Sequence, residues 1–211
     1  MSTFVLRYFG FPARAEITKA ILTCAKADWK LECPVWPDDK AKQPVGQLPV
    51  LIETKPDGTE FVLTDSVAIE TYLMKKFNVF IDVSLEQSVC QLQLRNQILD
   101  SCQMGWLYQF GGSDEVRQFA KQGFVGFLER VIKYHEQVLQ ENGSNGHYFG
   151  NKTGYADVAL YGGFNALKSI EGLTDIVMNL FSEQNAPLMN KVLKAVESDS
   201  MLADYVALCK Q

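Results

Sequence analysis

The chain has 211 residues, with 20 Lys and Arg against 25 Asp and Glu, so its formal net charge is −5. Hydrophobic residues make up 47% and charged residues 21%, a composition that excludes an intrinsically disordered chain. The acidic balance argues against non-specific nucleic-acid binding, which needs clustered lysine and arginine. No apolar run approaches the roughly 20 residues of a membrane-spanning helix, and the N-terminus has no basic, apolar leader. We expect a soluble, cytoplasmic protein of one or two domains that binds neither nucleic acid nor membrane.

Five cysteines are scattered along the chain with no C-x-x-C pair. An odd, dispersed set is not the pattern of a disulfide-stabilised protein. A zinc site would need closely spaced ligands, and His135 and His147 are the only histidines in the sequence. We therefore expect reduced thiols and no bound metal. The five are Cys24, Cys33, Cys90, Cys102 and Cys209.

The first third of the chain alternates strand and helix patterns. Residues 3–8 form a short apolar run with an aromatic end, which predicts a strand. The next apolar residues recur at i, i+3, i+4 and i+7, the spacing of one helix face, and predict a helix over 13–25. Residues 29–33 predict a second strand, so the chain begins with a strand–helix–strand unit that has a right-handed crossover.

A loop over residues 36–45, with at most one turn of helix, separates this unit from a hairpin. The strands expected at 49–53 and 60–63 flank an Asp-Gly pair, which is a strong hairpin signal. A helix is then predicted over 66–76. The order of elements is β-α-β, loop, β-β-α.

From about residue 84 the strand patterns end and helical periodicity takes over. One long helix is predicted to start near Leu85 and a second to cover 116–140. Shorter helices are predicted at 155–170, 175–181, 187–196 and 203–208. We expect an α+β chain in which an all-α domain, 84–211, follows a smaller α/β domain, 1–77, after a linker near 78–84.

Several residues of the first third could bind a ligand, and each also has a purely structural interpretation. Tyr8 ends the first strand, at the edge where ligands bind in open α/β sheets, but a tyrosine there is more often a packing residue. Asp65 and Ser66 precede a helix, where they serve as N-caps; the same helix end also suits a carboxylate. Trp36 and Lys40, taken alone, indicate only surface packing.

The peptide bond before Pro49 is a further candidate. An X-Pro bond is cis in only about 5–6% of cases, so the sequence favours the trans form. A cis bond here would leave the N–H and C=O of Leu48 free to pair with the peptide backbone of a ligand.

Taken together, these residues have the order and spacing found in the cytosolic glutathione transferases, and the chain resembles that family over its whole length. The resemblance implies a thioredoxin-like N-terminal domain followed by a helical domain. Residues 36–40 and 44–46 are most similar to the sigma class, which includes glutathione-dependent prostaglandin D synthases, and residues 46–49 also resemble the pi class. Val45 stands where pi-class relatives have an aromatic key, so a sigma-like, more polar dimer interface is expected.

The resemblance also implies residue roles, with glutathione as the co-substrate. Tyr8 would donate its hydroxyl to the glutathione sulfur and favour the thiolate, and Arg14 would add a positive charge. Neither serine nor cysteine lies between these two residues, which favours the tyrosine type over the serine and cysteine types. The glutathione-binding residues implied are Trp36 and Lys40 (glycyl end), Gln47, Leu48 and Pro49 (cysteinyl part), Asp65 and Ser66 (γ-glutamyl end), and Asp100 of the second subunit of a homodimer.

Small hydrophobic electrophiles would bind between the two domains. The residues expected there are Phe9, Met104, Trp106, Tyr108 and Tyr161, although an aromatic or methionine stripe at helical spacing is more often core. Gly154 stands where the family has a Ser or Thr helix cap, and glycine is an acceptable cap. The sequence therefore predicts a glutathione transferase that conjugates glutathione to hydrophobic electrophiles. Two alternatives remain: a glutathione-dependent isomerase of a lipid endoperoxide, and a non-catalytic carrier or lens-type protein.

Overall fold

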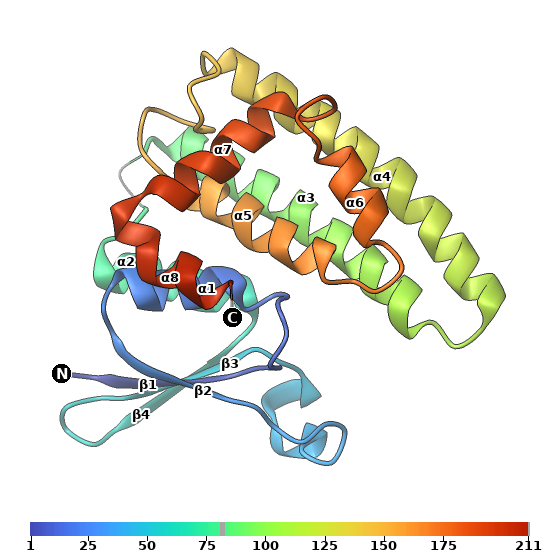
Figure 1. Ribbon diagram of the computed structural model, residues 1–211. Helices are drawn as coiled ribbons and strands as arrows, with labels where there is room; N and C mark the ends of the chain where they lie inside the picture. The colour runs from blue at the N-terminus through green and yellow to red at the C-terminus, as the bar shows by residue number, and fades with distance from the viewer. Residues whose placement is uncertain (81–82, 211) are drawn as a thin grey trace.

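The structure, a computed structural model, describes residues 1–80 and 83–210. Its strands all lie near the N-terminus and helices make up the rest (Figure 1). The first elements are β1 (Thr3–Arg7), α1 (Glu16–Cys24), β2 (Asp28–Glu32), the 3-10 turns η1 (Lys40–Lys42) and η2 (Pro44–Gly46), β3 (Val50–Thr54), β4 (Glu60–Thr64) and α2 (Ser66–Phe77). The later elements are α3 (Leu85–Phe110), α4 (Asp114–Glu141), α5 (Tyr155–Lys168), α6 (Thr174–Leu180), α7 (Pro187–Ser198), the 3-10 turn η3 (Ser200–Leu202) and α8 (Ala203–Leu208).

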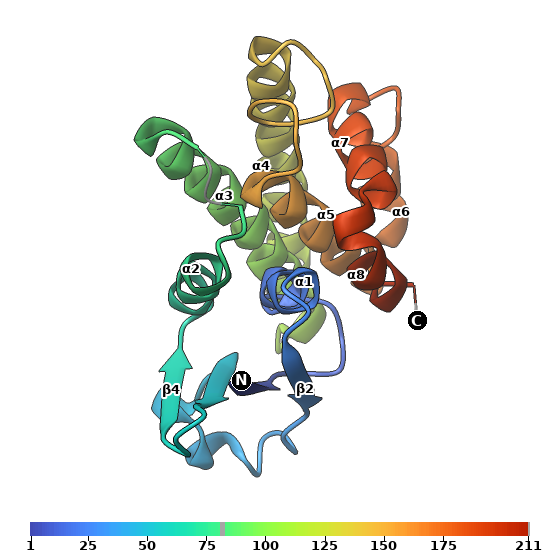
Figure 2. The ribbon, with the colours of Figure 1, turned by 90° about the vertical axis from the view of Figure 1, so that its left-hand side faces the viewer.

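The four strands form one mixed sheet in the order β2-β1-β3-β4. β1 is parallel to β2 and antiparallel to β3, with Phe4 opposite Trp29 on one side and Glu53 on the other. β3 and β4 form the predicted hairpin around Asp57-Gly58. α1 and α2 lie between the sheet and the later helices (Figure 2). This is the predicted thioredoxin-like arrangement followed by an all-α part.

One apolar core joins the sheet to the helices. Ile17 and Ile21 on the apolar face of α1 are buried in the same cluster as Ile69 of α2, Leu94 of α3 and Leu160 of α5. Because α1 packs against both α5 and α8, its position relative to the later helices is set by side-chain packing. That packing fixes the loop after β1 against α3, where the candidate site lies.

Local boundaries differ from the sequence-based expectation in a few places. α1 begins at Glu16 rather than at residue 13, because the chain first makes a turn in which the Glu16 N–H bonds the Ala13 carbonyl. The loop expected over 36–45 contains two 3-10 turns, and η3 was not predicted. The linker expected near 78–84 includes residues 81 and 82, which lie outside the described residues.

Two peptide bonds before proline are cis, Trp36–Pro37 and Leu48–Pro49. The expectation of a trans bond at Pro49 was therefore wrong; the general preference of X-Pro bonds for trans did not decide this one. The five cysteine thiols are free. Among the helices of the described residues, none has the length and apolarity needed to cross a membrane.

Candidate active site

A pocket of about 420 Å³ lies at the carboxyl end of β1. Four segments that are far apart in the sequence form its walls: the loop after β1, the stretch from Trp36 to β3, the junction of β4 with α2, and α3. It is lined by Phe9, Arg14, Trp36, Lys40, Gly46, Gln47, Leu48, Pro49, Thr64, Asp65, Ser66 and Gln103. The structure thus brings together Arg14 and the glutathione-binding residues that the sequence analysis assigned to the N-terminal part, whereas the buried Tyr8 is not among the lining residues. A larger hollow of about 620 Å³ lies beside residues 78–80 and 149–154, away from these side chains.

Tyr8 follows β1 directly and is only 3% exposed. Its hydroxyl oxygen accepts the main-chain N–H of Arg14 at 2.9 Å, so the hydroxyl hydrogen remains available to donate. Burial raises the pKa of Tyr8 well above its ordinary value, although the Arg14 N–H and guanidinium act in the opposite direction. Tyr8 is therefore a neutral hydrogen-bond donor at physiological pH.

The Arg14 side chain is held by a residue that the sequence analysis missed. Its Nη2 donates to Oε1 of Gln103 on α3 at 2.8 Å, and both residues line the pocket. Gln103 lies one helical turn before Trp106, and this spacing was the only signal that could have identified it. The pair joins the two parts of the chain across the pocket and places a guanidinium near the Tyr8 hydroxyl.

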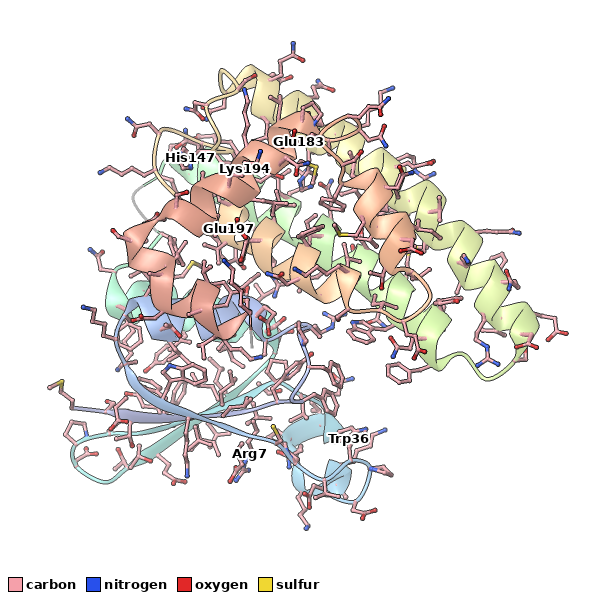
Figure 3. The ribbon with its side chains drawn as sticks, viewed as in Figure 1. Arg7, Trp36, His147, Glu183, Lys194 and Glu197 are labelled. Atoms are coloured by element: carbon pink, nitrogen blue, oxygen red, sulfur yellow. The ribbon has the colours of Figure 1, made fainter. Side chains whose placement is uncertain are left out.

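A second positively charged group lies at the other end of the pocket. Trp36, labelled in Figure 3, lies between β2 and β3, and Lys40 Nζ is 5.9 Å from the centre of its ring. The Phe9 ring meets the Trp36 ring edge-on at 5.5 Å. Among the described residues, the N–H and C=O of Leu48 have no hydrogen-bond partner. This end of the pocket therefore offers a cation and free main-chain groups.

At the start of α2, Asp65 is the N-cap and accepts the Ala68 N–H at 3.0 Å, as its structural interpretation predicted. Its backbone has φ 75° and ψ 123°, a region that residues other than glycine rarely adopt and that costs about 1–3 kcal/mol. Strain of this kind is typical of functional positions. The Ser66 hydroxyl beside it accepts from Arg95 Nη2 at 2.8 Å.

An aromatic wall extends from the loop after β1 to the end of α3. Phe9 stacks on Phe11 with ring centres 5.0 Å apart, and Phe11 lies 5.1 Å from Trp106. Trp106 stacks on Phe110 at 5.8 Å, and Phe110 is 68% exposed. Phe9 and Trp106 were predicted; Phe11 and Phe110 were missed, although Phe110 follows Trp106 at helical spacing.

The other residues expected to contact the electrophile lie elsewhere. Met104 lies against Gly123 of α4, and the Tyr108 hydroxyl lies beside Gly172. Each residue along an α-helix turns by about 100°, so positions 104 and 108 face away from 103, 106 and 110. Their contact with an electrophile stays a prediction.

Tyr161 is also placed in the helical core, not in the pocket. It is 3% exposed, packs edge-on against Tyr205 and donates to Glu197 of α7 at 3.4 Å. Figure 3 shows Glu197 among the later helices, far from Trp36. Asp100 is exposed on α3 and is not among the residues that line the pocket of its own chain.

Comparisons with known proteins give the family. A family model described as the C-terminal domain of glutathione S-transferase matches residues 100–208. "Probable glutathione S-transferase 6" of Caenorhabditis elegans is 26% identical, with 98% of this chain and 97% of that protein covered. "S-crystallin 2" of Enteroctopus dofleini is 24% identical over 76% of this chain and 79% of its own length. A solved sigma class enzyme of Fasciola hepatica shares the fold, with a TM-score of 0.77, 23% identity, and coverage of 98% of this chain and 96% of that one. The family model alone matches more than half of the chain, which therefore belongs to the glutathione S-transferase family, as predicted.

Proposed function

We propose that this chain conjugates glutathione to hydrophobic electrophiles and that the Tyr8 hydroxyl stabilises the glutathione thiolate. The observation that carries the proposal is the buried Tyr8 hydroxyl, which stays protonated and is anchored by the Arg14 N–H at 2.9 Å. Its neighbour Phe9 and its hydrogen-bond partner Arg14 both line a pocket with a free main-chain segment and a cation at one end. That combination suits a short peptide with a thiol and terminal carboxylates.

The thiolate is the nucleophile in this reaction. A thiol with a pKa of about 8.5 is only about 3% ionised at pH 7, so full ionisation gains about thirtyfold, or ~2 kcal/mol. The Tyr8 hydroxyl donates to the sulfur, and the Arg14 guanidinium adds a favourable charge. The thiol proton passes to solvent, the sulfur forms a bond to the electrophilic carbon, and the leaving group departs with its bonding electrons. Holding the electrophile beside the sulfur supplies the larger share of the rate.

Each part of glutathione has a matching group in the pocket. Lys40 is the partner for the glycyl carboxylate. The unpaired N–H and C=O of Leu48 suit the cysteinyl main chain, with Gln47 and Pro49 beside it. Ser66 and the N-terminus of α2 suit the γ-glutamyl carboxylate, and Asp65 its ammonium group. The aromatic wall from Phe9 to Phe110 gives a hydrophobic electrophile an apolar surface next to the sulfur.

We further propose a homodimer in which Asp100 reaches the γ-glutamyl amine bound by the partner. Val62 on the edge strand β4 and Leu85 and Val89 on α3 are apolar and exposed, and Figure 2 shows β4 and α3 along one side of the molecule. On α3 these apolar side chains alternate with the exposed polar residues Glu86 and Ser88, so this face suits a self-complementary contact of the more polar, sigma-like kind. Sedimentation velocity tests the dimer: we expect a single dimeric species, and a monomer at micromolar concentration would contradict it.

Steady-state conjugation to a reactive aryl halide tests the function, with Tyr8→Phe as the variant. We expect a clear wild-type rate that falls roughly tenfold or more in the variant, because one donor to the developing anion is lost. Equal rates would show that Tyr8 is not the activator. A product without glutathione would favour the isomerase, and tight binding of hydrophobic dyes without turnover would favour a carrier such as a crystallin.

A further inference from the structure

Ser66 is in contact with a buried charge network that crosses from the sheet-bearing part of the chain to the helical part. Its Oγ accepts from Arg95 Nη2 of α3 at 2.8 Å. Glu70 of α2 holds the same guanidinium in a bidentate pair, Nε to Oε2 at 2.9 Å and Nη2 to Oε1 at 2.6 Å. The side chains of Arg95 and Glu70 are 3% and 0% exposed, and the Tyr155 hydroxyl of α5 also donates to Glu70.

The direction of the hydrogen bond to Ser66 is fixed by chemistry. A guanidinium has only donors, so the Ser66 oxygen must be the acceptor. The hydroxyl hydrogen of Ser66 is therefore directed to some other acceptor, and among the described residues no protein group accepts it. Since Ser66 lines the pocket, the open side of its hydroxyl is where a ligand acceptor would lie.

The guanidinium is fixed more firmly than a surface arginine would be. Its planar fork is matched by both Glu70 oxygens, and such pairs have a defined geometry. A donor held in this way polarises the hydroxyl that it contacts and strengthens the next hydrogen bond in the chain. The arrangement orients Ser66 as a donor into the pocket.

We infer that Arg95 is a positioning residue for glutathione: held by Glu70, it orients the Ser66 hydroxyl to donate to the γ-glutamyl α-carboxylate. The inference rests on the proposed function of this pocket. It means that a residue of α3, buried outside the pocket, sets the affinity for one end of the co-substrate. A purely structural ion pair would stabilise the fold without discriminating between ligands.

The experiment compares two ligands by titration calorimetry. One is glutathione, and the other is 4-aminobutyryl-cysteinyl-glycine, which is glutathione with hydrogen in place of the γ-glutamyl α-carboxylate. The variant is Glu70→Gln with Arg95→Met, which removes both buried charges together and leaves no lone carboxylate in the core. The matched control is Tyr155→Phe, which removes another hydrogen bond to Glu70 but leaves the contact between Arg95 and Ser66.

In the double variant we expect the dissociation constant of glutathione to rise about tenfold or more, as for the loss of a hydrogen bond to a charged group. The dissociation constant of the analogue should change less than twofold. Ser66→Ala should give the same selective loss, and adding it to the double variant should cause no further loss. Tyr155→Phe should lower the melting temperature without changing the ratio of the two affinities.

The inference would be overturned if the double variant lost affinity equally for glutathione and for the analogue. It would also be overturned if Ser66→Ala lost affinity for glutathione alone and the double variant did not. If the double variant does not fold, Arg95→Lys replaces it. A single ammonium can pair with Glu70 but cannot serve both partners in the same geometry, so the same selective loss is expected. Failure of the wild-type protein to bind glutathione would overturn the proposed function, and the inference with it.

Discussion

Tyr8 is placed by a main-chain contact rather than by another side chain. The Arg14 N–H donates to its hydroxyl oxygen, and no substitution of Arg14 other than proline removes that donor. Because burial raises the pKa of Tyr8, this residue does not titrate in the neutral range. The pH dependence of conjugation therefore reports the ionisation of the bound glutathione thiol.

Lys40 and Lys42 are neighbours with different predicted roles. Lys40 lines the pocket beside Trp36, whereas Lys42 pairs with Asp39 at 2.6 Å on the surface. We expect Lys40→Met to raise the KM for glutathione about two- to fivefold, the range of an exposed ion pair. The KM of the variant should also depend less on salt.

Lys42→Met is the control for this effect, since it removes the same charge two residues away. Its KM for glutathione should equal that of the wild type in a steady-state assay at low salt. A matching rise in both variants would mean that Lys40 acts only through the general positive charge of this segment.

Among the elements, α5 has glycine at its N-cap, and its start is capped by a side chain from another helix. Gln91 of α3 is buried, and its Oε1 accepts the Ala156 N–H at 3.1 Å, while Gly154 donates its own N–H to Asp157 at 2.8 Å. A Cβ at Gly154 would come within 2.9 Å of that Gln91 oxygen. A side chain from another helix thus does what a capping Ser or Thr would do, and glycine makes room for it.

We expect Gln91→Ala to lower the free energy of unfolding by about 1–2 kcal/mol, the usual cost of a lost helix cap. Gly154→Ser alone should destabilise the protein, because its side chain collides with Gln91, and should recover part of the loss when combined with Gln91→Ala. Urea denaturation measures these values, with Gln118→Ala at an exposed position of α4 as control. Stabilisation by Gly154→Ser alone would contradict this explanation.

For the whole molecule, the buried side chain of His135 makes the free energy of unfolding depend on pH. It is buried on α4, with the Tyr148 hydroxyl 2.5 Å from Nδ1 and Gln97 Oε1 3.1 Å from Nε2. Burial lowers the pKa of His135 to about 3, below the ordinary 6.5. The unfolded state therefore binds a proton that the folded state does not, and the stabilisation present above pH 6.5 is lost as the pH falls toward 3.

Through His135, a fall in pH from 7 to 5 should lower the free energy of unfolding by about 2 kcal/mol. His135→Asn should make the pH dependence shallower, measured by urea denaturation at several pH values. His147 is the control with the opposite effect. Its hydrogen bond to Asp157 raises its pKa, so protonation of His147 stabilises the fold below pH 6.5. His147→Asn should therefore make the free energy of unfolding fall more steeply as the pH is lowered. If His135→Asn left the pH dependence of the free energy of unfolding unchanged, His135 would not be the group responsible for it.

The sequence predicted those features that depend on local pattern. The order of strands and helices and the Asp-Gly hairpin follow from short-range spacing, whereas the residues that converge at the carboxyl end of β1 were identified by the resemblance to the family. The network around Ser66 could not be predicted, since Arg95 and Ser66 are 29 residues apart and meet only through tertiary packing. The sequence also could not show which face of a helix meets the pocket, so the roles of Met104, Tyr108 and Tyr161 at the electrophile site stay predictions. The domain boundaries and the pi-class features stay predictions.

The pKa of the thiol of bound glutathione shows directly whether the Tyr8 hydroxyl stabilises the thiolate. Ultraviolet absorbance of the thiolate, followed as a function of pH in the binary complex, gives this pKa for the wild type and for Tyr8→Phe. We expect a wild-type pKa at least one unit below that of free glutathione, and a return toward the free value in the variant, because the hydroxyl that stabilises the anion is gone. A bound thiol whose pKa is the same in both proteins would show that Tyr8 does not stabilise the thiolate.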